Sequence, residues 1–320
     1  MATVSPGTAR GPRPEPIPAA GAHGGDGPAV AAALGVPVAE MVDLSQSLNP
    51  FAPDPRPVVA RHLDEIARYP DPTVATAALA AAMSVDPDRL VLTNGGAEAI
   101  TIVAAELRRG WVDEPDFGLY RRALGQLDPT GPRFRSNPHN PTGRLAPADE
   151  RAGVWDEAFY PLATGRWTRG DADTTVVGSL TKLLACPGLR LGYVLASDAD
   201  AARCFRQRQP AWAVNGLAAA ALPDLLESVD LPGWHASIAA ARAALVAVLA
   251  EHGIVARAAD APWVLADAPG LREQLAPHAV LVRDCAGFGL PGVVRIAVPD
   301  DAGRAALAAA LDRRARPALP

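Results

Sequence analysis

Short apolar runs and stretches of helical spacing alternate along the chain, and they indicate where strands and helices lie. In RLVLTNGGAEAITIVAAELRR, residues 89–109, an apolar run leads through two glycines into residues with helical spacing. This order predicts a strand, a glycine turn and an amphipathic helix. Three later apolar runs predict further strands, and the direction of the last relative to its neighbours stays open: 152–160, 173–182 and 189–196.

Helical spacing predicts the other main elements. The sequence favours helices at 28–35, ended by Gly35, and at 57–68, 72–83 and 232–252. Towards the end of the chain, three short apolar runs alternate with helical segments at about 268–276 and 301–315; the runs are WVLADA, AVLVRDC and VVRIAVP. Such alternation predicts an α/β large domain followed by a smaller α+β C-terminal domain.

Composition changes along the chain suggest four parts. Residues 1–28 are rich in Pro, Gly and Ala, which is typical of a flexible tail. An N-terminal arm, broken by prolines, is expected at 29–60. We expect the large domain at 61–212 and the small C-terminal domain at 213–320.

Composition and charge exclude several functions. A net charge of −5 without a basic stripe argues against nucleic acid as a partner. The three cysteines lie far apart with no CxxC pair, so we expect neither a metal site nor a disulfide framework, and a reducing cytoplasm fits. No charge-free apolar run reaches about 18 residues and no signal peptide is apparent, so we expect a cytoplasmic protein without a membrane span.

One residue stands out chemically. Lysine and arginine together number 30, and Lys182, in GSLTKLLACPGLRLGY, is the only lysine. A guanidinium stays protonated, whereas a desolvated ammonium can lose its proton and attack a carbonyl. Lys182 is therefore a candidate for covalent bonding to a carbonyl group. The alternative is a surface lysine retained by chance.

Four ordered motifs surround this lysine: NPHNPTG (137–143), WDEAF (155–159), SLTK (179–182) and GLRLGY (188–193). By these motifs the chain resembles the fold type I pyridoxal-phosphate enzymes over about residues 22–298. It is most similar to the branch that holds histidinol-phosphate aminotransferase and threonine-phosphate decarboxylase. The resemblance implies a three-layer α/β/α large domain, pyridoxal 5'-phosphate as cofactor and a homodimer.

The resemblance also implies roles for residues around the cofactor ring. Lys182 would hold the cofactor covalently and then move protons at the substrate Cα. Asp156 would pair with the pyridine nitrogen and keep it protonated; its structural alternative is a helix cap or surface acid. Asn140 would donate a hydrogen bond to the 3-hydroxyl oxygen, although it also fits a turn before a proline. Phe117 would stack on the ring, and core packing is the alternative.

Other matched residues would bind anions. The cofactor phosphate would lie among Ser179, Thr181, Arg190 and the backbone N–H groups of Gly96 and Ala97. The last two stand at a predicted helix start, which is a general anion site. Tyr69 would reach the cofactor phosphate of the neighbouring subunit. Arg295 would hold a substrate carboxylate and Arg283 a substrate phosphate.

Two features bear on the choice between decarboxylase and aminotransferase. HGGDGPAVAAALG (23–35) followed by VDLSQSLNPFAP (42–53) resembles the threonine-phosphate decarboxylase of cobalamin synthesis, and it adds His23 and Asn49 as expected substrate contacts. Phe159 stands where the aminotransferases commonly have a tyrosine. These features favour decarboxylation of L-threonine O-3-phosphate to (R)-1-aminopropan-2-yl phosphate. An aminotransferase acting on histidinol phosphate or a related amino acid is the alternative.

The chain departs from the family pattern in length. The segments 121–136 and 144–154 are short, so about one strand and two helices of the usual large domain are expected to be missing or reduced. The active-site residues are retained, which favours a compact enzyme. A non-catalytic protein that still binds the cofactor is the second alternative.

Overall fold

A computed structural model of the chain describes residues 17–21 and 24–314. The large domain is built on a five-stranded sheet in the order β2–β6–β5–β4–β3. Strands β3, β4 and β5 are parallel, whereas β6 runs antiparallel to both β5 and β2. The direction that the sequence left open for residues 189–196 is therefore antiparallel. The strands are β2 (Leu90–Asn94), β3 (Phe134–Ser136), β4 (Val154–Asp156), β5 (Thr175–Ser179) and β6 (Leu191–Leu195).

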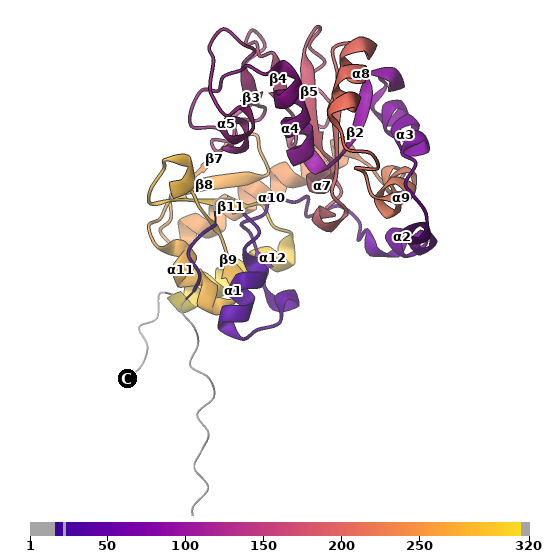
Figure 1. Cartoon of the computed structure of the whole chain (residues 1–320). Helices are drawn as coiled ribbons and strands as arrows, with labels where there is room; N and C mark the ends of the chain where they lie inside the picture. The colour runs from indigo at the N-terminus through magenta and orange to yellow at the C-terminus, as the bar shows by residue number, and fades with distance from the viewer. Residues whose placement is uncertain (1–16, 22–23, 315–320) are drawn as a thin grey trace, which may run out of the picture.

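Helices cover both faces of this sheet (Figure 1). Side chains of each strand point alternately to the two faces; thus Leu90 and Val176 join one buried cluster, and Val91 and Val177 another. The first cluster includes α3 (Thr73–Met83) and α9 (Gly216–Leu226). The second includes α4 (Gly95–Leu107), α5 (Leu119–Leu124) and α8 (Ala199–Arg208). The predicted three-layer α/β/α arrangement is confirmed.

The small domain, in the lower part of Figure 1, is a four-stranded antiparallel sheet in the order β10–β11–β8–β7. Its core also contains residues of α11 and α12, which confirms the α+β class. The N-terminal arm adds α1 and pairs β1 in parallel with β9. The elements are α1 (Gly27–Leu34), β1 (Val42–Asp43), β7 (Ala256–Ala258), β8 (Trp263–Asp267), α11 (Leu271–Leu275), β9 (Val280–Leu281), β10 (Arg283–Asp284), β11 (Val293–Ala297) and α12 (Asp301–Arg314).

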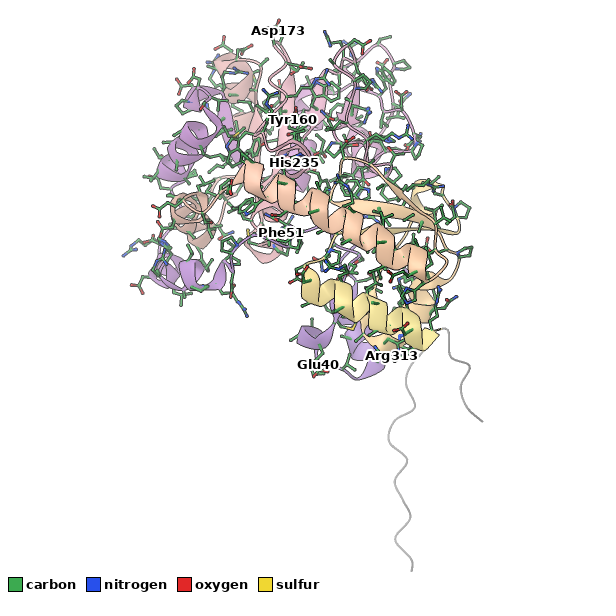
Figure 2. All side chains as sticks on the ribbon, turned by 180° about the vertical axis from the view of Figure 1, so that it is seen from behind. Glu40, Phe51, Tyr160, Asp173, His235 and Arg313 are labelled. Carbon is green, nitrogen blue, oxygen red and sulfur yellow. The ribbon has the colours of Figure 1, made fainter. Side chains whose placement is uncertain are left out.

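The long helix α10 (Leu231–Glu251) belongs to both domains. Ile238 joins the large-domain core, whereas Leu245 and Leu249 join the small-domain core. Figure 2 shows the helix crossing the back of the molecule, from His235 near Tyr160 to the region above α12. The change from one core to the other therefore lies within α10, beyond the predicted domain boundary at residue 213.

Helix α10 is also long and apolar enough, by length and composition, to span a membrane. This is weak support for a membrane span, since the core helix of a soluble protein passes the same test. Arg242 interrupts its apolar surface and donates two hydrogen bonds, to the carbonyl oxygens of Asp260 and Ala261. Because of Arg242, this helix contains no charge-free apolar run of about 18 residues, so the sequence did not predict it as a candidate span.

Several predicted elements differ in detail. The stretch 57–68 forms a short helix, α2 (Arg56–Ala60), and a 3-10 turn, and 279–285 forms two strands rather than one. Most of the predicted tail, at 1–16 and 22–23, lies outside the described residues, but α1 already begins at Gly27. Two short helices, α6 (Tyr160–Thr164) and α7 (Leu180–Leu183), follow β4 and β5. The 3-10 turns are Val38–Glu40, Leu63–Ala67, Pro87–Arg89, Pro187–Leu189, Ala276–His278 and Ala286–Phe288.

The shortened connections are held by side chains instead of helices. Between β3 and β4, residues 137–153 contain no helix, and arginine side chains bind the backbone there, with most contacts from Arg169. Arg169 donates to the carbonyl oxygens of Ala146, Pro147, Ala148 and Glu150 at 2.9–3.2 Å. It also pairs with Asp171 and lies over the indole ring of Trp155.

Candidate active site

A cavity of about 480 Å³ is formed by residues of the large domain, the small domain and the N-terminal arm. It contains the solitary lysine. Eleven predicted site residues line it: Gly96, Ala97, Phe117, Asn140, Asp156, Ser179, Thr181, Lys182, Arg190, Arg283 and Arg295. The fold thus brings together residues that are up to 199 positions apart in the sequence, between Gly96 and Arg295.

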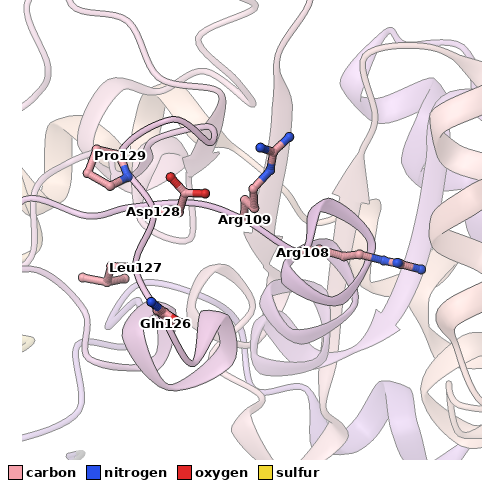
Figure 3. Close-up of a pocket in the computed structure, with 6 residues that line it drawn as sticks. All are labelled: Arg108, Arg109, Gln126, Leu127, Asp128 and Pro129. Carbon is pink, nitrogen blue, oxygen red and sulfur yellow. The ribbon is translucent and has the colours of Figure 1, made fainter.

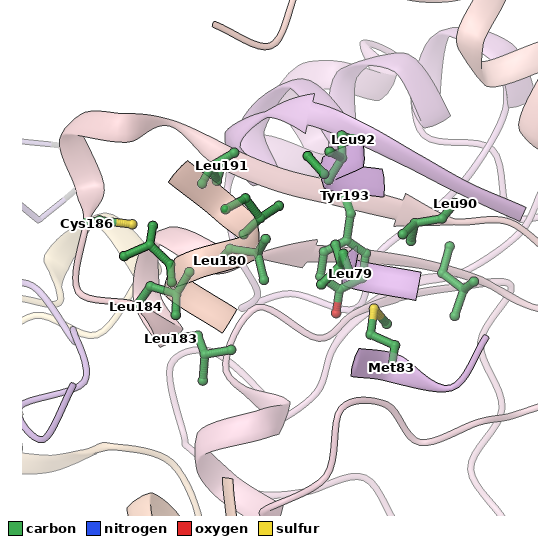
Figure 4. Packing of buried hydrophobic residues seen from close by; sticks show 14 of the residues in the cluster. Leu79, Met83, Leu90, Leu92, Leu180, Leu183, Leu184, Cys186, Leu191 and Tyr193 are labelled. Atoms are coloured by element: carbon green, nitrogen blue, oxygen red, sulfur yellow. The ribbon is translucent and has the colours of Figure 1, made fainter. Parts of the chain in front are cut away.

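Lys182 is held by the turn that follows β5. Its neighbours Leu180 and Leu183 are buried, and Figure 4 shows them in the leucine-rich cluster with Leu79 and Leu191. Burial, followed by the positive charges of Arg295 and Arg190, lowers the pKa of Lys182 to about 8. A substantial fraction of the amine is therefore neutral near pH 8, the form that attacks a carbonyl.

Asp156 ends β4 and lies on the cavity wall. One carboxylate oxygen accepts a hydrogen bond from the Ala158 N–H at 3.0 Å, and the other accepts one from the Tyr120 hydroxyl at 2.8 Å. Burial raises the pKa of Asp156 to about 6, against the effect of these hydrogen bonds. A positively charged partner, such as a protonated pyridine nitrogen, would favour the ionised carboxylate here.

Sequence reasoning missed Tyr120. Tyr120 lies on α5, three residues after Phe117, a spacing that brings two side chains together at a helical turn. The two rings pack edge to face, with their centroids 5.7 Å apart. This spacing in DFGLY was the available signal. Phe117 itself lines the cavity, where an aromatic ring can stack on a planar ligand.

The start of α4 and the β5–α7 turn form a cradle of hydrogen-bond donors. The hydroxyl groups of Ser179 and Thr181 lie 2.7 Å apart. A Cβ on Gly95, where φ is +79°, would lie 2.6 Å from an Arg190 nitrogen. Only glycine therefore lets the guanidinium approach the helix start this closely. Hydroxyls, guanidinium and unpaired first-turn N–H groups together are a donor set that fits a phosphate.

Arg283 and Arg295 face each other across β10 and β11, as directly paired residues of an antiparallel ladder. Arg295 is only 4% exposed and donates to the side-chain oxygen of Asn140 at 2.8 Å. Its guanidinium also lies over the Trp263 ring, 4.7 Å from the centroid. Burial and the charge of Arg283 lower the pKa of Arg295 to about 9. The arrangement favours an anionic ligand, which would offset both charges.

Two predicted site residues that the structure describes, Asn49 and Tyr69, do not line the cavity. Asn49 is 2% exposed, and its side chain is used within the protein, donating to the Leu183 carbonyl oxygen and accepting from the Phe51 N–H. Its backbone N–H donates to the Lys182 carbonyl oxygen. Tyr69 is 79% exposed and packs against Trp212, with ring centroids 4.6 Å apart. His23 lies outside the described residues.

The arm contributes four other residues that the sequence interpretation did not assign: Gly24, Ser45, Gln46 and Ser47. Asp43 holds this wall by accepting hydrogen bonds from the side chains of Ser45 and Gln46. Ser45 in turn accepts a hydrogen bond from the Gly25 N–H at 3.0 Å, which joins the two halves of the arm.

A second pocket, of about 330 Å³, lies at the end of α4 and is lined by Arg108, Arg109 and residues 126–129 (Figure 3). It shares no lining residue with the Lys182 cavity, and its lining residues include no lysine, cysteine, serine or threonine. Among the residues that the structure describes, no group of three or more His, Cys, Asp or Glu side chains is placed to hold a metal ion.

Comparison with known proteins gives consistent matches. The family model described as aminotransferase class I and II matches residues 134–311. Threonine-phosphate decarboxylase from Salmonella typhimurium is 33% identical over 252 residues, covering 62% of this chain and 68% of the relative. Histidinol-phosphate aminotransferase 1 from Dechloromonas aromatica is 28% identical, covering 88% and 91%. The structure of histidinol-phosphate aminotransferase from Sinorhizobium meliloti with pyridoxal-5'-phosphate has a TM-score of 0.78 at 17% identity, covering 90% and 93%.

Proposed function

This chain belongs to the class I and II aminotransferase family, as its motifs predicted, and we propose that it decarboxylates L-threonine O-3-phosphate to (R)-1-aminopropan-2-yl phosphate in cobalamin biosynthesis. It is a pyridoxal-phosphate-dependent enzyme, like the decarboxylase and aminotransferases it matches. The bound cofactor supplies an electron sink for the bond broken at the substrate Cα.

The residues of the cavity have distinct roles in this proposal. Lys182 holds the cofactor and moves protons at Cα, and Asp156 pairs with the pyridine nitrogen. The cradle of Ser179, Thr181, Arg190 and the start of α4 holds the cofactor phosphate. Asn140 is already bound to Arg295 through its oxygen, which leaves its amide N–H groups to donate to the cofactor's 3-hydroxyl oxygen.

The main support for the proposed substrate is the excess of positive charge in the cavity. Five cationic side chains and one carboxylate, Asp156, line it: Arg122, Lys182, Arg190, Arg283 and Arg295. In this proposal Arg190 binds the cofactor phosphate and Lys182 holds the cofactor, so Arg122 and the paired arginines 283 and 295 remain. A substrate with both a carboxylate and a phosphate matches two adjacent guanidinium groups. Histidinol phosphate offers only the phosphate.

The N-terminal arm supports the same choice. The HGG and D-x-S segments are the ones that resemble the decarboxylase, and Gly24 and Ser45 from these segments stand on the cavity wall. In this proposal the residues that select the substrate include Gly24 and Ser45, and they belong to the segments that distinguish the decarboxylase from the aminotransferases. Phe159 also lines the cavity without a hydroxyl group, and it packs edge to face on Trp263.

The test is turnover of L-threonine O-3-phosphate by the purified protein loaded with pyridoxal phosphate. We expect release of carbon dioxide and formation of an aminopropanol phosphate without a 2-oxo acid. Arg283→Leu should raise KM about 10- to 100-fold, since a charge-assisted hydrogen bond contributes about 1.5–3 kcal/mol. Arg257→Leu, on the same sheet but exposed, is the matched control. Absence of carbon dioxide together with brisk amino transfer to 2-oxoglutarate would reject the decarboxylase.

That outcome would support the second candidate, an aminotransferase acting on histidinol phosphate or a related amino acid. The specific observation in its favour is coverage, because the aminotransferase match extends over 88% of this chain and the decarboxylase match over 62%. Half-transamination, seen as loss of the cofactor's visible band on adding an amino donor, distinguishes this candidate.

Exposed apolar side chains support a homodimer as the working form of this proposed cytoplasmic enzyme. Five apolar or aromatic side chains are more than half exposed: Leu63, Ile66, Tyr69, Val74 and Trp212. They lie on the 3-10 turn Leu63–Ala67, between that turn and α3, at the start of α3 and in the segment before α9. In a dimer, Tyr69 of one subunit would reach the cofactor phosphate of the other. Tyr69→Phe, which keeps the apolar ring, should weaken cofactor binding without dissociating the dimer in analytical ultracentrifugation.

A further inference from the structure

A second buried carboxylate, Asp116, lies behind the cavity wall and has no role in the proposed reaction. It is 3% exposed and does not line the cavity. Its two oxygens accept hydrogen bonds from the Ser136 hydroxyl, from the Ser136 N–H at 3.1 Å and from the Phe117 N–H at 2.7 Å. A buried carboxylate is costly unless it is fully hydrogen-bonded, so its retention here needs a reason.

Hydrogen bonds connect Asp116 to the substrate side of the cavity. The Ser136 hydroxyl oxygen, which donates to Asp116, accepts from the backbone N–H of Asn140 at 2.8 Å. The Asn140 side chain then accepts from Arg295 at 2.8 Å. Three successive contacts thus lead from Asp116 to the guanidinium expected to bind the substrate carboxylate.

Asp116 also influences the residues expected to contact the cofactor. Ser136 and Asp156 are register partners in the β3–β4 pair, and the Tyr120 hydroxyl bonds to Asp156 at 2.8 Å. Burial is the main cause of the raised pKa of Asp156 and of Tyr120, and the negative charge of Asp116 raises both further. The backbone N–H of Phe117, the predicted stacking ring, is bound directly to Asp116.

The charged groups around these residues leave Asp116 without an ion pair among the described side chains. Arg135 is the cation that acts on it, and the Arg135 guanidinium pairs with Glu150 at 3.0 Å. Lys182 is influenced by Arg295, Arg190, Asp156 and Arg283. The charge of Asp116 is therefore balanced by direct hydrogen-bond donors and, at longer range, by Arg135, and its field extends to Asp156.

We propose that Asp116 is a positioning residue of this active site, which holds Phe117 and Asn140 in place and adds a second buried negative charge next to Asp156. Its role concerns cofactor binding and does not depend on which bond at Cα is broken. A failure of the proposed decarboxylation would therefore leave it intact.

The decisive variant is Asp116→Asn, which keeps the size of the side chain and removes its charge. It should weaken cofactor binding about tenfold, measured by fluorescence titration of the apoprotein with pyridoxal phosphate. The pH midpoint of the bound cofactor's visible band should fall by about 0.5 units, because a nearby negative charge favours protonated forms. Asp113→Asn, which removes an exposed carboxylate three residues earlier, should change neither value.

Ser136→Ala separates the two effects. It removes the contact to Asn140 and the hydroxyl donor to Asp116, but it keeps the carboxyl group and its two backbone N–H donors. It should therefore weaken cofactor binding and lower the pH midpoint by less than about 0.3 units. If Asp116→Asn folds and matches Asp113→Asn in both measurements, the proposal is wrong. If Asp116→Asn does not fold, Ser136→Ala decides: unchanged affinity for the cofactor or a larger midpoint shift overturns the proposal, and weakened affinity with a midpoint shift below about 0.3 units supports it.

Discussion

Replacing Arg169 by methionine tests whether one guanidinium stabilises the shortened large domain. The Arg169 side chain is 10% exposed and is fixed by four backbone carbonyl oxygens, by Asp171 and by the Trp155 ring. Methionine keeps much of the apolar stem but donates no hydrogen bond. The carbonyl oxygens of residues 146–150 would then depend on water alone.

The magnitude follows from these contacts. Hydrogen bonds to a charged donor contribute about 1.5–3 kcal/mol each when buried, but several of these carbonyl groups lie near the surface and regain water. We therefore expect a total loss of about 3 kcal/mol rather than the sum. With an unfolding entropy of about 2.1 cal/mol/K per residue, this lowers Tm by about 4–5 °C for a chain of this size.

Calorimetry of the cofactor-loaded protein measures Tm, and limited proteolysis reports on the 137–153 connection. Arg166→Met is the matched control, since Arg166 is exposed and lies three residues earlier. It should change Tm by less than about 1 °C. Equal melting temperatures for Arg169→Met and Arg166→Met would refute the reasoning, as would unchanged cleavage of the connection.

Three further predictions concern the cavity. The rate of cofactor capture should rise with pH through about 8, because the neutral amine of Lys182 attacks the carbonyl group of the cofactor. Lys182→Ala should abolish the visible band. A rate that stays constant between pH 7 and 9 would contradict this reasoning. Tyr120→Phe removes a hydrogen bond that lowers the pKa of Asp156, so the affinity for the cofactor should fall about tenfold in fluorescence titration. An unchanged affinity would show that this hydrogen bond does not contribute to cofactor binding. Gly192→Ala places a Cβ 2.4 Å from the backbone of Gly95, so it should displace the start of α4 and weaken phosphate binding at least about tenfold; parent-like titration curves would show that the helix start tolerates the shift.

Much of the cavity could be predicted because its residues stand in local motifs. Lys182, Asp156 and Asn140 each lie at a strand end or a turn, and the order of the motifs along the chain indicates how they come together. The alternation of strands and helices likewise predicted the α/β and α+β classes of the two domains, and the resemblance to the family implied the three layers. The sequence signal was strongest where the function of a residue depends on its immediate neighbours.

Long-range partners could not be predicted in this way. Asn49 was assigned to the substrate, yet its side chain binds the Leu183 carbonyl oxygen, 134 residues away. Asp116 and Tyr120 were missed, because their importance depends on Ser136 and Asp156 from other strands. The contacts that hold the shortened connection between β3 and β4 could not be predicted either. Arg169 is one of many arginines, and only its position relative to residues 146–150 distinguishes it.

The contact between Asn49 and the lysine turn has a consequence for how the chain matures. The backbone around Lys182 is completed only when the N-terminal arm has docked, since Asn49 binds the carbonyl oxygens of both Lys182 and Leu183. Closing a loop of this length is entropically costly, so the contact forms late relative to local structure. The yellow colour of the captured cofactor therefore reports that distant parts of the polypeptide have assembled. Its appearance during refolding is expected to follow docking of the N-terminal arm.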